Sequence, residues 1–452
     1  MKIIYSCHLF TAMLCVATAA GCDAANADGE GDQTAATQED NVRNLSSVRL
    51  NHNQSFDGKG YSVKGEKGPH IFALEGFHAG VSNIYVADNR NAQVAAFDIG
   101  DGRFQYLDNA TIVNAGPGAV RMHGRNGNGL ARLENVTAEQ ITGTGVFIGS
   151  SVHEVRATSI YMAGMIDYSG GRGLPRAGTV GWRQKTPTER NIAVGGHQIS
   201  KTNMISSDIG YWLTDAQLTS FSQSIADANR GYGLIIDGDS DEIIFDDLFC
   251  AFNRGIKIAG NSTNVRLTNL RTKNIGEIPP WGQSNWYGNV KKFYDITVED
   301  KAQIIIDGNS WRGNKRVSVA PSANLTVTGG IYYRGQSGST VLNGATAYLS
   351  ERGAVANPNE ALWRAADNGY LFSMEYSVDN APGVGQNYTV TVQVNGVDTS
   401  LKGTISGTGN FFLKSYGPIE VKEGDRIGAK IVTSKGSNYM ANHTVNIQQL
   451  PM

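Results

Sequence analysis

Cysteine is nearly absent from the body of this chain, which has four cysteines among its 452 residues. Cys7, Cys15 and Cys22 fall in or beside an apolar N-terminal stretch, so the rest of the chain contains Cys250 alone. A single body cysteine excludes a disulfide framework. Cys250 lies in the apolar stretch "DDLFCAF", where we expect a buried core thiol rather than a nucleophile.

The sequence also has few charged residues and little helical periodicity. Charged residues make up 18% of the chain and the formal net charge is −2, which argues against nucleic acid as a partner. No P-loop, dinucleotide fingerprint or zinc-ligand spacing occurs, so no cofactor is expected to be required. From about residue 50 to 350 no helical period is sustained, and short strands rich in Val, Ile and Leu are expected instead.

The N-terminal segment has the features of an export signal. Met1 and Lys2 precede the apolar run "IIYSCHLFTAMLCVATAA". Two processing routes remain open, namely cleavage at the A-x-A-like site 17–19 and lipidation of Cys22 in "AAGC", which resembles a bacterial lipobox. We predict a signal over 1–22, an acidic flexible tether over 23–45, and an exported protein that is periplasmic, secreted or anchored to a membrane through Cys22.

A short element recurs along the body, consisting of a small residue followed by an apolar strand. It reads "AVRM" at 119, "GVFI" at 145, "GMID" at 164, "GYWL" at 210, "GLII" at 233 and "GIKI" at 255, so the last three are 23 and 22 residues apart. This period predicts a parallel β-solenoid whose coils stack ~4.8 Å apart around a shared core. Gly is expected at coil corners, and Asn253, Asn269 and Asn274 are expected to satisfy turn backbone groups.

The repeat resembles the right-handed parallel β-helix of the pectate-lyase-like superfamily, which includes polysaccharide lyases, polygalacturonase-type hydrolases, epimerases and phage tailspikes. The resemblance implies an all-β chain with a parallel β-helix over 46–354. Beyond residue 355, longer alternating strands and a hairpin turn at Asn395-Gly396 predict an antiparallel β-sandwich over 355–452. That segment resembles C-terminal domains of tailspike-like proteins, which implies a binding module or a homotrimer-forming module.

The string Asn-Arg-Gly occurs at 229–231 and again at 253–255. In polygalacturonase-like relatives, catalytic carboxylates precede the corresponding glycines. At the corresponding places, this chain has Asp208 before the glycine corner of one coil. The glycine corners of the next two coils are preceded by Arg230 and Arg254. Arginine binds a carboxylate through two parallel hydrogen bonds, which suits a uronic-acid substrate. The alternative is that both arginines bind turn carbonyls or pair with an aspartate.

Elimination also needs groups that transfer protons. The Gly-rich basic insertion at 169–202 is a long loop of the kind in which binding residues concentrate. At its end lies His197, our candidate base, and just before it lies Tyr168, a second candidate base or acid. A structural role is the alternative for His197.

Outward positions of the repeat strands form a mixed apolar and basic stripe. In "GIKI" the isoleucines face the core, so Lys257 faces solvent. The same position in other coils is occupied by Arg121, Phe147, Ile166, Trp212 and Ile235. Substrate contacts are expected from Lys257, Trp212 and Tyr232, and from Trp281 and Trp286 in the loop "IPPWGQSNWYGN". For the two loop tryptophans, covering the end of the core is an equal alternative.

The acidic run "IDGDSDEIIFDD" at 236–247 leaves three alternatives open. It is compatible with a solvated turn, with a Ca²⁺ site and with the carboxylate pair of a hydrolase. Across the whole chain, the leading hypothesis is an exported enzyme that cleaves an acidic, uronic-acid-containing polysaccharide by β-elimination. A glycoside hydrolase with paired aspartates is the second hypothesis, and a non-catalytic glycan-binding surface or tailspike-like protein is the third.

Overall fold

The chain folds almost entirely into β-structure. The computed structural model describes residues 42–45, 47–59, 62–124, 128–149, 151–168, 172–185, 195–290, 292–337, 344–351, 353–357, 362–408, 412–434 and 441–452. Strand makes up 63%, and these ranges contain no helix, which confirms the predicted all-β class. Accordingly, the same ranges hold no helix long and apolar enough to span a membrane. The predicted signal, Cys22 and the tether as far as residue 41 lie outside the described residues.

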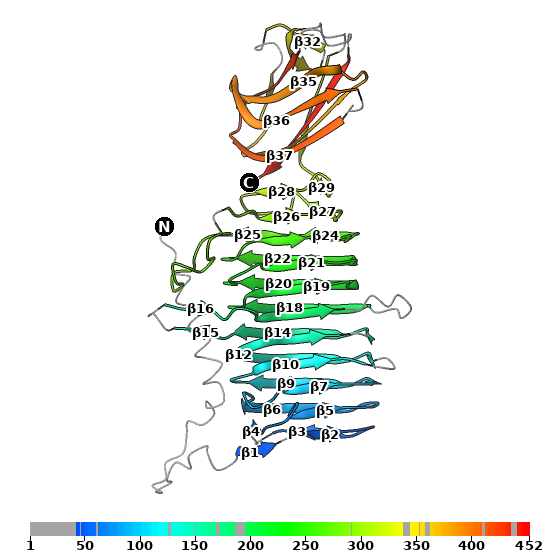
Figure 1. Ribbon diagram of the computed structural model, residues 1–452, viewed down its shortest axis with the longest axis vertical. Helices are drawn as coiled ribbons and strands as arrows, with labels where there is room; N and C mark the ends of the chain where they lie inside the picture. Colours follow the sequence, from blue (N-terminus) through cyan, green and yellow to red (C-terminus); the bar gives the residue numbers. More distant parts are fainter. Residues whose placement is uncertain are drawn as a thin grey trace, which may run out of the picture. The chain divides into compact units, whose positions relative to one another are not determined.

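Twenty-four parallel strands build a solenoid of about 11 turns, confirming the architecture expected from the repeat (Figure 1). One strand system, the short-strand sheet, consists of β2 (Val48–Leu50), β5 (Phe72–Leu74), β7 (Phe97–Ile99), β10 (Gly116–Met122), the end of β12 (Arg132–Ile148), β17 (Val180–Lys185), β19 (Ile209–Thr214), β21 (Leu234–Asp237), β23 (Ile256–Ile258), β26 (Ile296–Val298) and β28 (Val317–Val319).

The remaining solenoid strands form the long-strand sheet. They are β1 (Val42–Leu45), β3 (Ser55–Asp57), β4 (Ser62–Gly65), β6 (Gly80–Asp88), β9 (Tyr106–Ile112), the start of β12, β14 (Arg156–Gly164), β18 (His197–Ile205), β20 (Gln217–Asp227), β22 (Asp241–Ala251), β24 (Val265–Thr268), β25 (Arg271–Lys273), β27 (Gln303–Asp307) and β29 (Asn324–Thr328). Outside the coils, β8 (Gly102–Arg103), β11 (Asn128–Gly129) and β13 (Val152–His153) pair in a small sheet, and β15 (Ile166–Asp167) pairs with β16 (Leu174–Pro175).

The long strands bend at a position where one residue per coil has positive φ. Asn83, Asn109 and Asn135 adopt φ of 50°, 51° and 53° there. Asparagine tolerates this conformation better than most residues because its short polar side chain bonds locally. Asn109 Nδ2 also donates to Asn83 Oδ1 at 2.8 Å, so the bends of adjacent coils are tied together. Asn269 and Asn274 occupy comparable corners, with φ of 50° and 53°, but the Asn269 amide donates to Asp246 Oδ1 at 2.8 Å rather than to the turn backbone group that was predicted.

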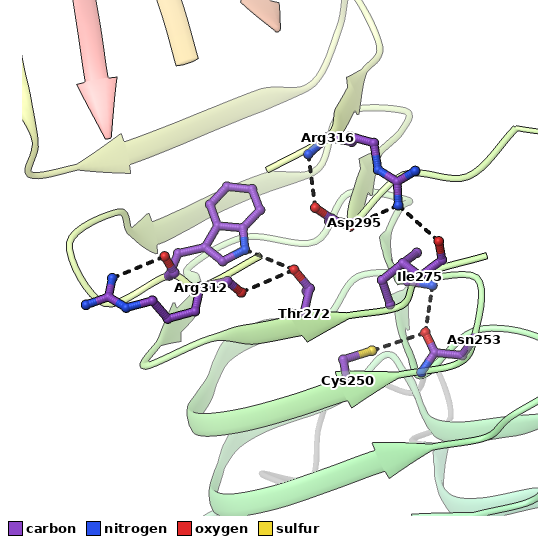
Figure 2. A network of polar contacts seen from close by, with 9 residues as sticks. Cys250, Asn253, Thr272, Ile275, Asp295, Arg312 and Arg316 are labelled. Carbon is purple, nitrogen blue, oxygen red and sulfur yellow. Dashed lines mark hydrogen bonds and ion pairs between the residues drawn. The ribbon is translucent and has the colours of Figure 1, made fainter. Parts of the chain in front are cut away.

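Buried turns close the coils on the other side. Asn253 Nδ2 donates to the carbonyls of Ala226 and Ala251 at 3.0 and 2.9 Å, and its Oδ1 accepts from Gly255 N–H. The Cys250 thiol donates to the same oxygen at 3.3 Å (Figure 2), which confirms a buried cysteine in the core. Gly255 has φ of +86°, and a Cβ there would lie 2.2 Å from the Tyr294 carbonyl oxygen. The asparagine and glycine of the repeated string are therefore explained by the turn.

Aromatic side chains fill much of the solenoid interior. Phe72 stacks on Phe97 with ring centroids 5.5 Å apart, and Phe221 stacks on Phe245 at 4.4 Å. Each pair joins adjacent coils at equivalent positions, because parallel register places identical faces in contact. A regular, continuous core of this kind holds the outward side chains of successive coils in fixed register.

The C-terminal region is an antiparallel sheet that is nearly closed on itself, which confirms the antiparallel β-domain predicted after the solenoid. Its strands are β30 (Ile331–Gln336), β31 (Thr346–Ser350), β32 (Gly353–Val355), β33 (Trp363–Arg364), β34 (Gly369–Val378), β35 (Gly383–Val394), β36 (Val397–Gly407), β37 (Phe412–Val421), β38 (Arg426–Thr433) and β39 (His443–Pro451). The sequence pattern placed the boundary near 355, but antiparallel pairing already begins where β30 joins β39. The last coils contact this sheet through Trp311 against Phe372 and through the Tyr416 hydroxyl, which donates to the Leu325 carbonyl at 2.8 Å.

Candidate functional site

The short-strand sheet presents one outward side chain per coil in a continuous row. Parallel pairing aligns Arg121 with Asp98 on one side and with Phe147 on the other. We call this set the short-strand row, and its members in order are Asp98, Arg121, Phe147, Arg183, Trp212, Ile235 and Lys257. Charged, aromatic and aliphatic side chains thus follow one another at intervals of one coil, about 4.8 Å.

Ile166, which the repeat pattern assigned to this row, does not belong to it. After Gly164 the chain leaves the coil as the antiparallel hairpin β15–β16 and returns in β17, where Arg183 occupies the row position. The string "GMID" matches the repeat but precedes the insertion. The strand that continues the coil follows the hairpin.

Asp98 is the centre of a polar cluster on this face, the Asp98 cluster. His123 Nε2 lies 3.0 Å from Asp98 Oδ2, and Arg121 Nη1 lies 3.7 Å from Oδ1. His70 Nδ1 is 3.8 Å from Oδ2. The Asp98 side chain is 15% exposed, whereas those of Arg121 and His123 are 38% and 33% exposed. A largely buried carboxylate therefore supports two side chains that solvent and a bound ligand can reach.

The electrostatics of the cluster define the roles of its members. Burial alone would raise the pKa of Asp98, but the hydrogen bond from His123 and the charges of His123, Arg121 and His70 outweigh it and hold that pKa below its usual value. Burial lowers the pKa of His70, although the nearby Asp98 charge opposes this. An ionised Asp98 accepts the hydrogen of His123 Nε2–H, so the lone pair of the neutral ring is on Nδ1. His123 can then take up a proton from a bound molecule.

Further along the row, Arg183 lies flat on Trp212. The guanidinium carbon is 3.6 Å from the ring centroid. Trp212 Nε1 donates to Asp237 Oδ2 at 3.0 Å, and the Thr214 hydroxyl donates to the other oxygen of Asp237. The indole predicted to contact substrate is therefore fixed from one edge and covered on one face by a cation.

Arg230 and Arg254 occupy neighbouring coils, as the repeat predicted. Arg230 N–H donates to the Ser207 carbonyl, and Arg254 N–H donates to the Gly231 carbonyl. Arg254 Nη2 also donates to the Tyr287 carbonyl at 3.2 Å, and its buried Nε has no hydrogen-bond partner. This contact matches the turn-carbonyl alternative for Arg254.

Asp208, the third member of the predicted constellation, is held by a different segment. Its Oδ2 accepts from Gly178 N–H at 2.9 Å, and its own N–H donates to Thr179 Oγ1 at 2.8 Å. Among the ion pairs of the described residues, none joins Asp208 to Arg230 or Arg254. Asp208 thus fixes the return from the β15–β16 hairpin.

His197 cannot act with these arginines as a base. It begins β18 and is 1% exposed, whereas Arg230 follows the other end of the neighbouring long strand β20. Its Nδ1 accepts from Val155 N–H at 3.1 Å, and burial lowers its pKa to about 4, with a further contribution from His153. The physical reason for the error is the position of the insertion, whose end re-enters the coil interior.

The loop tryptophans cover the solenoid surface, which decides the alternative that the sequence left open for Trp286. Trp286 is fully buried and packs with Ala228 and Tyr287. Trp281 is partly buried and meets Trp286 edge to face, with ring centroids 5.1 Å apart. Neither the ring face nor the edge of Trp286 is therefore available to a sugar.

The loop containing these tryptophans also contacts the hairpin that precedes β17. Gly173 N–H donates to the Trp281 carbonyl at 2.9 Å, and Gln283 N–H donates back to the Gly173 carbonyl at 3.0 Å. Two insertions more than one hundred residues apart in sequence thereby form one lateral wall. Tyr168, at the base of the hairpin, is 58% exposed. It remains a candidate for contact with a ligand.

Lys257 and Tyr232 lie toward the far end of the row. Lys257 Nζ is 2.7 Å from Glu299 Oε2. Burial would lower the pKa of Lys257, but the hydrogen bond and charge of Glu299 outweigh it and raise the pKa. Tyr232 is partly buried and close enough to contribute to the same shift. Lys257 is thus a cation that is already paired.

The acidic run at 236–247 is tied into the coils by donors from the next coil. Asn261 Nδ2 donates to Asp239, Asn264 Nδ2 to Asp241, and Thr268 Oγ1 to Asp246, at 2.9, 2.9 and 2.7 Å. No group of three His, Cys, Asp or Glu side chains within the described ranges is arranged to hold a metal ion. These carboxylates therefore have structural partners, and a calcium requirement stays an untested prediction.

Sequence reasoning missed His70, Asp98, His123 and Arg183. A signal for two of them was present, because "AFDIG" precedes the recognised element "AVRM" by one coil and places Asp98 before Arg121. His123 follows Arg121 by two residues and comes directly after the end of β10, so alternation continued for one residue would place both side chains on the outward face. Extending the repeat by one coil toward the N-terminus would have brought the three residues together.

No protein-family model and no curated protein matches the sequence. Among solved structures, the chain is similar to an alginate lyase from Paenibacillus sp. str. FPU-7, with 8% identity and a TM-score of 0.40 over 63% of this chain and 98% of that one. It is also similar to the A-module of a mannuronan C-5 epimerase from Azotobacter vinelandii, with 12% identity and a TM-score of 0.39 over 64% of this chain and 91% of that one. A third similar structure is the Dettilon tailspike protein, with 8% identity and a TM-score of 0.38 over 90% of this chain and 88% of that one. At these values, residue roles follow from the geometry of this chain alone.

Proposed function

We propose that the protein is a lyase that cleaves an acidic, uronic-acid-containing polysaccharide by β-elimination on the outward face of the short-strand sheet. The observation that carries the proposal is the 3.0 Å hydrogen bond between His123 and Asp98 beside Arg121. These residues bring together a proton acceptor, a carboxylate that fixes its tautomer and a cation for the sugar carboxylate. Elimination next to a carboxylate needs a cation for that carboxylate, a base, and an acid for the leaving oxygen, and His123 serves as base and then as acid.

Each member has a definite task in the reaction. Arg121 binds the sugar carboxylate and stabilises the charge that develops on it when the adjacent carbon loses its proton. His123 takes that proton at Nδ1, while Asp98 holds Nε2–H and stabilises the imidazolium. The electron pair forms a carbon–carbon double bond and the bond to the glycosidic oxygen breaks. That oxygen receives a proton from the imidazolium, which restores neutral His123.

The rest of the short-strand row supports an acidic, chain-like substrate. Phe147 and Trp212 provide ring surfaces, and Arg183 provides positive charge, at intervals of one coil. A linear polysaccharide that lies along the coil-stacking direction would pass these side chains in order. The lateral wall formed by the hairpin and the 278–290 loop adds a boundary beside the upper coils.

The proposal includes export, through cleavage of the signal over 1–22 or through lipidation of Cys22. Its support is the apolar run after Lys2 together with the single body cysteine. Cell fractionation of the full chain and of a Cys22→Ser variant tests this part. A lipid anchor predicts that Cys22→Ser moves the protein from membranes to the soluble exported fraction, whereas cytoplasmic retention of the full chain contradicts export.

The activity test is a panel of uronic-acid polysaccharides, followed by ultraviolet absorbance of the conjugated double bond. We expect absorbance to rise with at least one polymer, and His123→Asn to lower the rate by at least about 100-fold. Arg156→Gln, which removes an exposed arginine from the long-strand sheet, is the matched control and should leave the rate unchanged. New reducing ends without absorbance would identify hydrolysis and refute the lyase.

A further inference from the structure

Arg183 is a cation that forms no ion pair with another residue in the described part of the chain. Its Nη1 is buried and has no hydrogen-bond partner. Burial lowers the pKa of Arg183, although the charges of Asp237 and Asp215 act in the opposite direction. A guanidinium that has lost water on one side without gaining an acceptor is unfavourable in the free protein. Arg183 as a whole is only partly buried, so an anion supplied from outside can bind the guanidinium from its solvent-facing side and offset its charge.

Asp237, the carboxylate whose charge acts most strongly on Arg183, forms no hydrogen bond or ion pair with it among the described residues. Asp237 accepts from Trp212 Nε1 at 3.0 Å and from the Thr214 hydroxyl, so both its oxygens are engaged by neutral donors. Its position fixes the indole, and the indole in turn holds the guanidinium plane at 3.6 Å. Arg183 is therefore oriented before any ligand binds, with donors unused.

We propose that Arg183, held on Trp212, is a subsite for an anionic group of a sugar that does not itself react. The planar guanidinium presents two parallel N–H donors, which match a carboxylate or a sulfate. The proposal rests on the proposed function, because it takes the ligand to be an acidic glycan bound along the short-strand row. It deepens that function by requiring charge on a second sugar of the substrate.

The position of the subsite follows from the coil register. Arg183 in β17 is two coils from Arg121 in β10, because β12 lies between them. Two coil steps correspond to about 10 Å along the solenoid. The anion at Arg183 therefore belongs to a different sugar from the one at the Asp98 cluster. A polymer that is acidic only at the reacting sugar would leave Arg183 unpaired.

The test measures binding without turnover. His123→Asn protein is titrated with a uronate tetrasaccharide, a sulfated tetrasaccharide and neutral cellotetraose, and wild-type protein is titrated with those probes that it does not cleave. In the same background, Arg183→Gln is compared with Arg183→Lys and with the control Arg156→Gln. We expect Arg183→Gln to weaken binding of one acidic probe by about 10- to 100-fold, with a smaller loss for Arg183→Lys. Neutral cellotetraose and the Arg156→Gln control should show no change.

The probe that loses affinity identifies the anion as carboxylate or sulfate. The subsite is refuted if Arg183→Gln binds both acidic probes as tightly as its parent, if it loses neutral and acidic probes equally, or if no acidic probe binds any of the parents. Circular dichroism and thermal unfolding of each variant establish that it is folded, and Arg183→Lys provides a second substitution. Loss of acidic binding in a protein that forms no unsaturated product would refute the lyase and retain the subsite.

Discussion

His123 and Asp98 are 25 residues apart in sequence, and His123 Nε2 lies 3.0 Å from Asp98 Oδ2. Asp98 is in β7 and His123 directly follows β10, and these strands of adjacent coils are paired in parallel register. Stacking at about 4.8 Å brings outward side chains of successive coils within hydrogen-bonding reach. The contact therefore depends on the solenoid rather than on local sequence.

Asp98→Asn tests the role of this contact in the reaction. Asparagine keeps the shape but lacks the charge, and its amide nitrogen can bond Nε2 and so favour the tautomer with hydrogen on Nδ1. We expect the rate of unsaturated-product formation to fall by at least about 100-fold, with folding retained. Asp88→Asn, at a carboxylate paired with exposed Arg90, is the control and should be active. A rate within a few-fold of wild type would remove Asp98 from the mechanism.

Stability should depend on pH through two buried histidines. Burial lowers the pKa of both His197 and His443 to about 4, from an ordinary 6.5. The unfolded chain binds these protons below 6.5 while the folded protein does not, so the free energy of unfolding falls as pH drops from 6.5 toward 4. Each histidine contributes on the order of 3 kcal/mol over that window. Urea unfolding at several pH values gives the free energy of unfolding as a function of pH, and between pH 6.5 and 4 this free energy should change less in His197→Gln than in wild type. An unchanged pH dependence would contradict the burial of His197 in its neutral form.

Asp227 should act with the opposite sign. Burial raises its pKa to about 6, against a hydrogen bond from Ala228 N–H, and its Oδ1 has no partner. When the pKa of a carboxyl group is raised by folding, the free energy of unfolding falls as pH increases from about 4 through 6. Asp227→Asn should therefore raise the free energy of unfolding at pH 8 by about 2–3 kcal/mol and have little effect at pH 4. Destabilisation at pH 8 would show that the ionised form is needed.

Trp286→Ala tests whether this ring covers the core or contacts sugar. Removing a fully buried indole costs about 3–5 kcal/mol of packing, which the 278–290 loop should show as local opening. The backbone amides of residue 286 and of Gly288 donate hydrogen bonds within the loop. We expect their hydrogen exchange to accelerate in the variant by at least about 100-fold. The affinity for a uronate tetrasaccharide should change less. Lost affinity with unchanged exchange would restore the sugar-contact role.

The solenoid could be predicted because its signals are local. The 22- to 23-residue period, the alternation in "GIKI" and the asparagines at corners all follow from how one coil must bend and stack. Lys257 and Trp212 were placed on the outward face for the same reason. The predicted boundary between the two regions, near 355, lies too late in the sequence. The reason is that β30 resembles a coil strand in sequence and is distinguished only by its pairing with β39.

The candidate site could be predicted only in part. Arg230 and Arg254 do lie on adjacent coils, but which atoms they bind depends on the 278–290 loop, whose path is not encoded in the repeat. His197 resembled a loop histidine, and its burial is fixed by the coil that it re-enters. Asp98 lies 23 residues before Arg121, within the recognised period, so the Asp98 cluster was missed because the repeat was not extended by one coil toward the N-terminus.

The parallel register of the short-strand sheet has a consequence for how such a protein can change its substrate. Each coil contacts the coil before and the coil after, so insertion or loss of one coil leaves the others intact. Between Arg121 and Arg183 there is one intervening coil, that of β12. The separation of the two cations can therefore change only by whole coils, about 4.8 Å at a time. Substrates with different spacing between charged sugars would be matched by coil number rather than by substitution of side chains.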